Sequence, residues 1–184
     1  THDLVLSYKY EGNYVPLRGK ECSTQQMPII SEKIPTFEEF ANASIEDIYG
    51  DEIIDAYERK VTSFESIVLI NRGNNKFDVQ KLPTLAQSIP ILTSDVYDIN
   101  NDGFEDIVVA GNIYNTEVET PRLDNQFALV LISNKNSNYN VIGPDKSGLY
   151  LSGNTKSIKI IGNDNPKLLV ANNNSDLEVF ELNK

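Results

Sequence analysis

The chain has 184 residues, of which 40% are hydrophobic, and a formal net charge of −11. This length and composition suit one folded domain or a portion of a larger protein, and the sequence has no run of about 20 apolar residues that would insert into a membrane. The acidic excess argues against nucleic acid as a partner, because phosphates would be repelled, and against anionic membrane surfaces.

The first predicted element is a hairpin near the N-terminus. The apolar residues Leu4-Val5-Leu6 precede a turn at Glu11-Gly12-Asn13, and Tyr14 opens the second strand. Residues 1–34 are therefore predicted to hold a hairpin and a link. Because the chain starts at Thr1 without Met or a signal peptide, we expect a processed or excised portion of a longer protein.

Residues 35–60 are predicted to be a small helical insertion. Thr36 as N-cap with Glu39 three residues later predicts a capping box, and Ser44 with Asp47 predicts a second one. The run 51–59 also permits a helix, and an apolar stripe is predicted at Ile48, Ile53, Ile54 and Tyr57. We expect these helices to pack on the rim of the main fold, with a partner-docking surface as the alternative.

A repeat with a period of about 60 residues organises the rest of the chain. Residues 67–79 align without gaps on residues 129–141, an offset of 62 from Ile67 to Leu129. Each copy is a β-branched run, an Asn-rich turn and an aromatic residue that opens a second strand, which predicts a hairpin. Tyr14 lies 63 residues before Phe77, so the N-terminal hairpin is a third copy.

Between these hairpins, residues 98–106 read D-x-N-x-D-G-x-x-D. Ca²⁺ binds six to eight oxygen ligands, and residues at positions 1, 3, 5, 7 and 9 of a tight loop converge on one point. The predicted ligands are the side chains of Asp98, Asn100, Asp102 and Asp106 and the backbone carbonyl of Phe104. Gly103 supplies the left-handed backbone of the turn. The competing interpretation is an ordinary Asn/Asp/Gly turn between strands.

The flanking residues decide which kind of calcium loop this is. An EF-hand needs a helix on each side and a bidentate Glu at position 12, which is Val109 here. The segments 89–97 and 107–111 are β-rich, so the loop is predicted to join two strands. Residues 168–173 repeat 107–112 at an offset of 61, but Ile160, Gly162 and Lys167 replace the metal-ligand positions. The second loop is therefore predicted to bind no ion.

The predicted fold is mainly β, with four-stranded antiparallel units of the β-propeller-blade type, about two and a half in this chain, and a small α-helical insertion. The predicted boundaries are a partial blade at 1–34, the helical insertion at 35–60, a blade with the calcium loop at 61–125 and a blade with the degenerate loop at 126–184. Closed propellers use 4–8 blades, so we expect the remaining blades in another part of a longer polypeptide.

The loop 98–106 with the following Ile107-Val108-Val109-Ala110-Gly111-Asn112 resembles the FG-GAP (VCBS-type) repeat, which builds the β-propeller of integrin α-subunits and of many large bacterial surface proteins. The turn 71–77 is similar to the N-x-G-x-G-x-F link of that family, with Asn75 in place of the second Gly. Residues 18–28 and the helical stretch 35–50 resemble the C-terminal part of bacterial ASPIC/UnbV-group proteins, although the ASPIC/UnbV motif itself is not visible.

The resemblance implies a calcium-stabilised, non-catalytic propeller segment of an extracytoplasmic protein that serves binding, scaffolding or assembly at the cell surface. The implied partners are the remaining blades of the parent chain or a surface-complex protein, with glycan as a further candidate. The sequence is also poor in catalytic residue types, because His2 is the only histidine and Cys22 has no histidine partner. Cys22 is interpreted as a small, partly buried apolar residue.

The alternative is a glycan-binding or glycan-cleaving propeller enzyme that uses paired carboxylates. Its candidate carboxylates lie in the link 115–125: Glu117, Glu119 and Asp124. Arg122 in the same link is a candidate for binding a carboxylate or sulfate, and Tyr97 and Tyr114 are candidates for stacking on a sugar ring. A solvated charged loop is the simpler interpretation, and no spacing in this segment favours catalysis.

Overall fold

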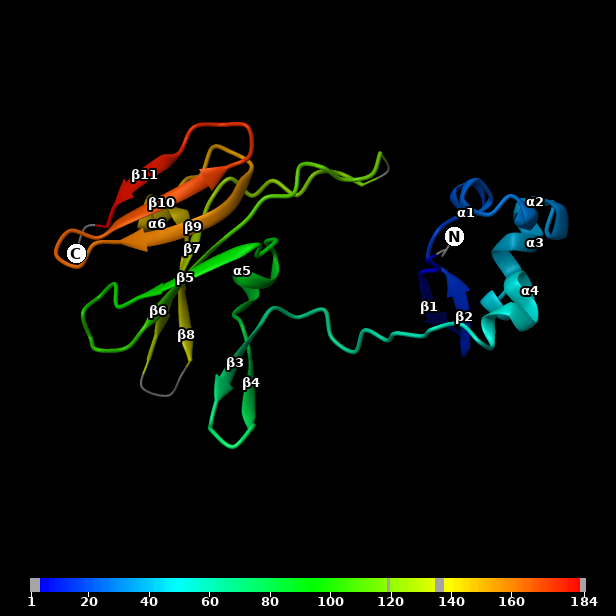
Figure 1. Ribbon diagram of the computed structural model, residues 1–184, viewed down its shortest axis with the longest axis horizontal. Helices are drawn as coiled ribbons and strands as arrows, with labels where there is room; N and C mark the ends of the chain where they lie inside the picture. The colour runs from blue at the N-terminus through cyan, green and yellow to red at the C-terminus, as the bar shows by residue number, and fades with distance from the viewer. Residues whose placement is uncertain (1–3, 119, 135–137, 183–184) are drawn as a thin grey trace. The chain divides into compact units, whose positions relative to one another are not determined.

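The computed structural model describes residues 4–118, 120–134 and 138–182. The protein is mainly β and divides into two compact units, residues 1–62 and residues 63–184. The strands form small antiparallel sheets, and a few short helices accompany them (Figure 1). No closed barrel or propeller is present in the described part of the chain.

The first unit is a two-stranded hairpin followed by short helices. Both central residues of its turn, Glu11 and Gly12, have positive φ, which is the geometry of the tightest hairpin turns. The elements are β1 Ser7–Tyr10, β2 Asn13–Pro16, α1 Lys20–Gln26, α2 Ile29–Lys33, α3 Phe37–Asn42, α4 Ile45–Tyr49 and the 3₁₀ helix η1 Gly50–Ile53. The predicted hairpin is confirmed, and its first strand begins at Ser7.

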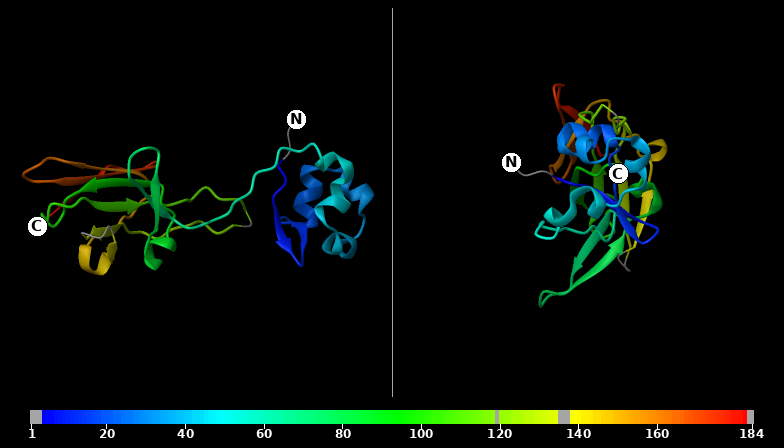
Figure 2. Two further views of the ribbon diagram at one scale, coloured as in Figure 1. Left: turned by 90° about the horizontal axis from the view of Figure 1, so that it is seen from below. Right: turned by 90° about the vertical axis from the view of Figure 1, so that its right-hand side faces the viewer.

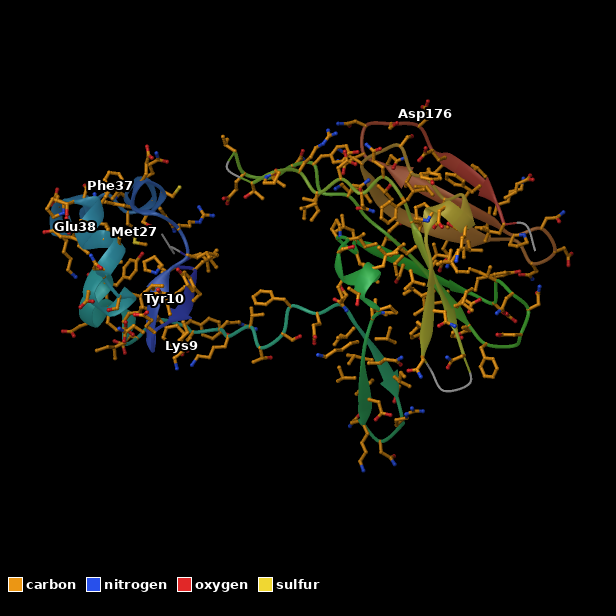
Figure 3. The ribbon with its side chains drawn as sticks, turned by 180° about the vertical axis from the view of Figure 1, so that it is seen from behind. Lys9, Tyr10, Met27, Phe37, Glu38 and Asp176 are labelled. Atoms are coloured by element: carbon orange, nitrogen blue, oxygen red, sulfur yellow. The ribbon has the colours of Figure 1, made fainter. Side chains whose placement is uncertain are left out.

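Both predicted capping boxes are present in this unit. The Thr36 hydroxyl accepts the N–H of Glu39, whose carboxylate in turn accepts the N–H of Thr36, and Ser44 and Asp47 make the same exchange. These exchanges satisfy N–H groups that short helices otherwise leave without partners. Around them, Ile30, Ile34, Phe40, Ala43 and Ile48 form a buried core with Met27 beside it (Figure 3).

Two expectations for this unit were wrong. Helix already begins at Lys20, so the link 18–34 is largely helical and the helices are not confined to 35–60. The predicted stripe also fails, because Ile48 is buried but Ile54 and Tyr57 are exposed. The helical structure ends with η1 at Ile53, after the positive φ of Gly50 has redirected the chain, so residues 54–57 do not lie on one helical face.

The second unit contains three antiparallel sheets. Their orders are β3-β4, β5-β6-β7-β8 and β11-β10-β9. The elements are β3 Ile67–Asn71, β4 Phe77–Lys81, α5 Thr84–Gln87, β5 Thr93–Tyr97, β6 Asp106–Ala110, β7 Leu129–Ser133, β8 Tyr139–Ile142, α6 Pro144–Ser147, β9 Thr155–Ile161, β10 Lys167–Asn172 and β11 Glu178–Glu181.

The 62-residue repeat is confirmed as a repeat of hairpin register. In the β3–β4 hairpin Ile70 faces Asp78, and in the β7–β8 hairpin Ile132 faces Asn140. Each residue of one pair lies 62 positions from its counterpart. Because side chains alternate along a strand, a shared register also means that equivalent residues occupy equivalent faces of the two hairpins.

The central sheet β5–β8 has an apolar layer on each face. The C-terminal sheet β9–β11 lies over one of these faces (Figure 2). On one side, Val108 and Val130 pack with Ile158, Leu168 and Val170 of the C-terminal sheet. The other layer joins side chains from β3, the α5 region, β6 and β7: Val68, Leu82, Ala86, Ile89, Val109, Leu129 and Leu131. Burial of both faces explains why β7 is an unbroken apolar run and shows no polar alternation.

Side chains of β5 join the central sheet to the C-terminal sheet. The hydroxyl of Thr93 accepts the N–H of Ile158 at 3.1 Å, and the carboxylate of Asp95 accepts the N–H of Ile160. Lys159 donates to the same carboxylate at 2.7 Å. These bonds satisfy backbone N–H groups along β9 that have no neighbouring strand on that side.

Candidate functional site

The predicted calcium loop connects the ends of two paired strands. It runs from the end of β5 at Tyr97 to the start of β6 at Asp106, and these two residues face each other across the hairpin. Both flanking elements are strands, so the predicted strand–loop–strand context is confirmed and the helices of an EF-hand are absent on either side.

The first part of the loop wraps around the carboxylate of Asp98. Its two oxygens accept the backbone N–H groups of Asp102 and Gly103, each at 3.0 Å. Gly103 has φ +85°, so the predicted need for glycine at this turn is confirmed. Asn101 also has positive φ, at +56°, and Asn is one of the few residue types that adopt this conformation readily.

Asn100 and Asp102 lie against this turn. The amide oxygen of Asn100 accepts the same Asp102 N–H at 3.0 Å that Asp98 accepts, so two predicted ligand oxygens meet at one donor. The Asp102 carboxylate accepts the Asn100 amide at 2.9 Å and the N–H of Phe104 at 2.9 Å. Asp98, Asn100 and Asp102 are thus brought together, and Phe104 follows directly on the exposed part of the turn.

Asp106 anchors the loop to the sheet. It is fully buried, and its two carboxylate oxygens accept the N–H of Ile99 at 3.0 Å and the N–H of Ser133 at 2.8 Å. Ser133 ends β7, so one side chain fixes the loop to the neighbouring strand. Burial raises the pKa of the nearby Tyr139, and the negative charge of Asp106 raises it further. No sequence pattern identified Ser133, because it lies 27 residues from Asp106.

The donor set of the loop suits a hard cation more than it suits a transition metal. All side-chain donors are oxygens, and a carboxylate that accepts two N–H groups retains further lone-pair directions. Among the described residues, none of Asp98, Asp102 and Asp106 takes part in an ion pair. The same part of the chain contains no group of three or more His, Cys, Asp or Glu side chains placed to hold a metal ion. Calcium binding therefore stays a prediction.

The second loop, 162–166, joins β9 and β10 and is shorter than the first because β9 continues to Ile161. Lys167 begins β10 as Asp106 begins β6, so the predicted equivalence of these two positions holds in the fold. Lys167 is exposed and pairs with Glu181 at 3.6 Å. The two loops lie side by side, because the hydroxyl of Tyr97 donates to the carbonyl of Asn163 at 3.2 Å.

The link 113–125 holds the residues of the glycan hypothesis. Its two ends pair through Ile113 and Leu123. Glu117 is exposed, Glu119 lies outside the described residues, and Asp124 is half-buried. The predicted carboxylate pair therefore stays a prediction. The hydroxyl of Tyr97 donates to the carbonyl of Asn163 in the second loop, and Tyr97 packs against the apolar layer that contains Val108 and Val130.

Arg122 contacts two other residues of this link, Asp124 and Tyr114. Its guanidinium contacts the Asp124 carboxylate at 2.7 Å and lies 4.6 Å from the centre of the Tyr114 ring. The Tyr114 hydroxyl donates to Asp124 at 3.2 Å. Burial raises the pKa of Tyr114, as does the Asp124 carboxylate. These groups border an open cleft of about 370 Å³ lined by residues 87–90 and 122–125, and the amide oxygen of Asn125 is buried there without a hydrogen-bond partner.

The two remaining candidates are Cys22 and His2. Cys22 lies on α1 and is partly buried, in keeping with the predicted packing role. His2 lies outside the described residues. Within the described ranges, no helix is long and apolar enough to cross a membrane.

Comparison of the chain with protein-family models, with curated proteins and with solved structures finds no match. The resemblance to FG-GAP repeats therefore depends on the residues quoted for it, chiefly the loop 98–106.

Proposed function

We propose that this chain is a non-catalytic, calcium-stabilised scaffold segment of a larger extracytoplasmic protein, with FG-GAP-type propeller blades that serve binding or assembly. The observation that carries the proposal is the loop 98–106, in which an all-oxygen donor set joins two strand ends and a fully buried carboxylate, Asp106, has no cationic partner in the described part of the chain.

Calcium would be held by Asp98, Asn100, Asp102, Asp106 and the carbonyl of Phe104. The ion would neutralise the carboxylates of Asp98 and Asp102, which now accept backbone N–H groups and the side-chain amide of Asn100. A ligand that binds only the folded state stabilises that state by mass action. The role of the loop is therefore mechanical: it would fix β5 to β6 and, through Asp106, to β7.

The repeated sheets support the propeller-type architecture. A complete four-stranded sheet lies between two apolar layers, and the hairpin β3–β4 repeats the register of β7–β8. Blade-like units that bury both faces in this way need neighbours on each side. The remaining blades of the parent chain or a surface-complex protein are the proposed neighbours. Weak oxygen sites of this kind fill at extracellular calcium concentrations, which favours an extracytoplasmic location.

The test is calorimetric titration and thermal unfolding of the whole chain with Ca²⁺ and with a chelator. Ca²⁺ at a hundredfold excess over its Kd is expected to stabilise the chain by about 2.7 kcal/mol. Asp102→Ala should abolish the effect. The matched control is Asp164→Ala, because Asp164 lies 62 residues later in the degenerate loop and is also exposed.

The control should respond to Ca²⁺ as the native chain does. Absence of calcium-dependent stabilisation in the native chain would contradict the proposal. Equal loss of the effect in the Asp102 and Asp164 variants would also contradict it, because that would locate the response outside the first loop.

A second candidate function is glycan binding, with or without cleavage. The observation that favours it is the guanidinium of Arg122, held by Asp124 and the Tyr114 ring at the border of the 370 Å³ cleft. A guanidinium fixed in this way is suited to a sugar carboxylate or sulfate. Titration with acidic oligosaccharides should then show binding that Arg122→Ala removes, and turnover of a polysaccharide would overturn the non-catalytic assignment.

A further inference from the structure

The two units are joined by a segment that has neither helix nor strand, residues 54–66, between η1 and β3 (Figure 1). Every residue from 54 to 65 is exposed, and three of them are large apolar residues: Tyr57, Val61 and Phe64. Within the described part of the chain, the backbone groups of residues 57–62 make no hydrogen bond. A stretch of this length without structure usually has a function or serves as a linker.

Two adjacent basic residues, Arg59 and Lys60, lie in the middle of this segment. Lys60 pairs with Glu58 at 3.1 Å and lies 5.8 Å from the centre of the Tyr14 ring. The Arg59 guanidinium lies 5.1 Å from the centre of the Tyr57 ring. Ion pairs and cation–π contacts are weak at exposed sites, so both basic side chains are readily released to a binding partner.

The other described lysines and arginines lie where the backbone is already held. Most of the lysines are in helices or strands: Lys9, Lys20, Lys33, Lys81, Lys146, Lys156, Lys159 and Lys167. Arg72 and Lys76 lie in the β3–β4 turn, which is closed by a backbone hydrogen bond of 2.9 Å between them and has positive φ at residues 73–75. Arg122 is held by an ion pair, and the carbonyl of Arg18 accepts a side-chain hydroxyl.

We propose that residues 57–64 are a processing site, at which an endoprotease of the trypsin class cuts the folded chain after Arg59 or Lys60. The specificity pocket of this class ends in a carboxylate, which takes a basic side chain. An extended peptide binds through main-chain hydrogen bonds, so its backbone groups must not already be bonded elsewhere. Hydrolysis adds the hydroxyl of water to the carbonyl carbon of the basic residue and a proton to the following nitrogen. This inference does not depend on calcium binding.

The cut would leave the core of each unit intact. The buried cluster of Ile30, Phe40 and Ile48 lies wholly within residues 1–62, and the two apolar layers of the central sheet lie wholly within residues 63–184. Processing therefore divides the chain into a helical unit and a sheet unit, each of which retains its own core.

The experiment is limited digestion of the whole chain with trypsin, with the products identified by mass spectrometry. The cut after residue 59 or 60 should be at least about tenfold faster than a cut at any other described basic residue, because those require local opening of the structure. The double variant Arg59→Gln, Lys60→Gln should slow the loss of the full-length chain at least about tenfold. The matched control is Arg72→Gln, which should leave the rate unchanged, because Arg72 is also exposed but lies in the closed turn.

A protease of the chymotrypsin class separates loss of recognition from loss of folding in the double variant. It takes aromatic residues, so it should cut after Tyr57 or Phe64 at the same rate in the native chain and in the double variant. The proposal is overturned if trypsin first cuts at another described residue, if the double variant is digested as fast as the native chain, or if the segment resists both proteases. Rapid degradation of either product would also overturn it, because the products would then not be compact units.

Discussion

Asp106 is expected to be the most important residue of the loop for stability even when no metal ion is present. Its buried carboxylate accepts the N–H groups of Ile99 and Ser133, whereas Asp102 is exposed. Hydrogen bonds to a charged group contribute about 1.5–3 kcal/mol each, so loss of two amounts to about 3–6 kcal/mol. The lower end, about 3 kcal/mol, is expected for Asp106→Ala, because the same change removes the cost of burying a charge.

The assay is urea unfolding followed by circular dichroism, with a chelator present throughout. Asp106→Ala should lower the denaturation midpoint by an amount equivalent to about 3 kcal/mol without changing the m-value. Asp106→Asn keeps the shape and one acceptor oxygen, so about half of this loss is expected. Asp102→Ala should remain within about 0.5 kcal/mol of the native chain, as surface substitutions usually do.

The reasoning would be refuted if Asp106→Ala and Asp102→Ala destabilised the metal-free chain equally. That outcome would mean that the bonds from the loop to β6 and β7 do not determine its stability. Repeating the series with Ca²⁺ separates the two roles of the loop, because the calcium proposal requires every one of these carboxylates for the calcium-dependent gain, and the structural argument requires only Asp106.

Two further predictions follow from the backbone and from titration. Gly111→Ala should destabilise the chain by at least about 2 kcal/mol more than Gly103→Ala, as measured by urea unfolding. A Cβ at Gly111 would lie 2.5 Å from the carbonyl oxygen of Pro90. A Cβ at Gly103 meets no atom within 4 Å and adds only backbone strain of about 1–2 kcal/mol. Burial alone would raise the pKa of Asp95, but the hydrogen bonds and the ammonium group from β9 outweigh it and hold that pKa below its ordinary value. The stabilisation from Asp95 is therefore complete above the unfolded-state pKa of about 3.9 and is lost as the pH falls through the folded-state pKa. Asp95→Asn should reduce the loss of stability at acid pH in a curve of unfolding free energy against pH. Asp176→Asn, at an exposed position (Figure 3), should leave that curve unchanged.

The N-terminal unit illustrates where local sequence signals are sufficient. The capping residues Thr36 and Ser44 predicted two helix starts, and both hold in the structure because a capping box involves only residues three positions apart. The stripe that was expected to continue to Tyr57 failed because a single positive φ, at Gly50, changes the direction of the chain. Beyond such a point, the spacing of apolar residues no longer predicts that they lie on one face of a helix.

In the loop 98–106 too, the local contacts were predicted from the sequence and the long-range contact was not. The turn at Gly103 and the grouping of Asp98, Asn100 and Asp102 were predicted from residues 98–106, and the position between strands from the flanking segments 89–97 and 107–111, because all these signals are local. The bond from Asp106 to Ser133 was not predicted. It requires β7 to lie beside β6, and that pairing is a property of the sheet.

By itself, the sequence determined the hairpins, the 62-residue repeat and the candidate ligands of the loop, since turn chemistry and side-chain alternation act over a few residues. Only the tertiary structure decided which repeated faces are buried. Leu69 and Leu131 are equivalent in sequence, yet one is exposed and the other is in the core. The physical reason is that burial depends on a neighbouring sheet, and the repeat pattern does not record whether that neighbour is present.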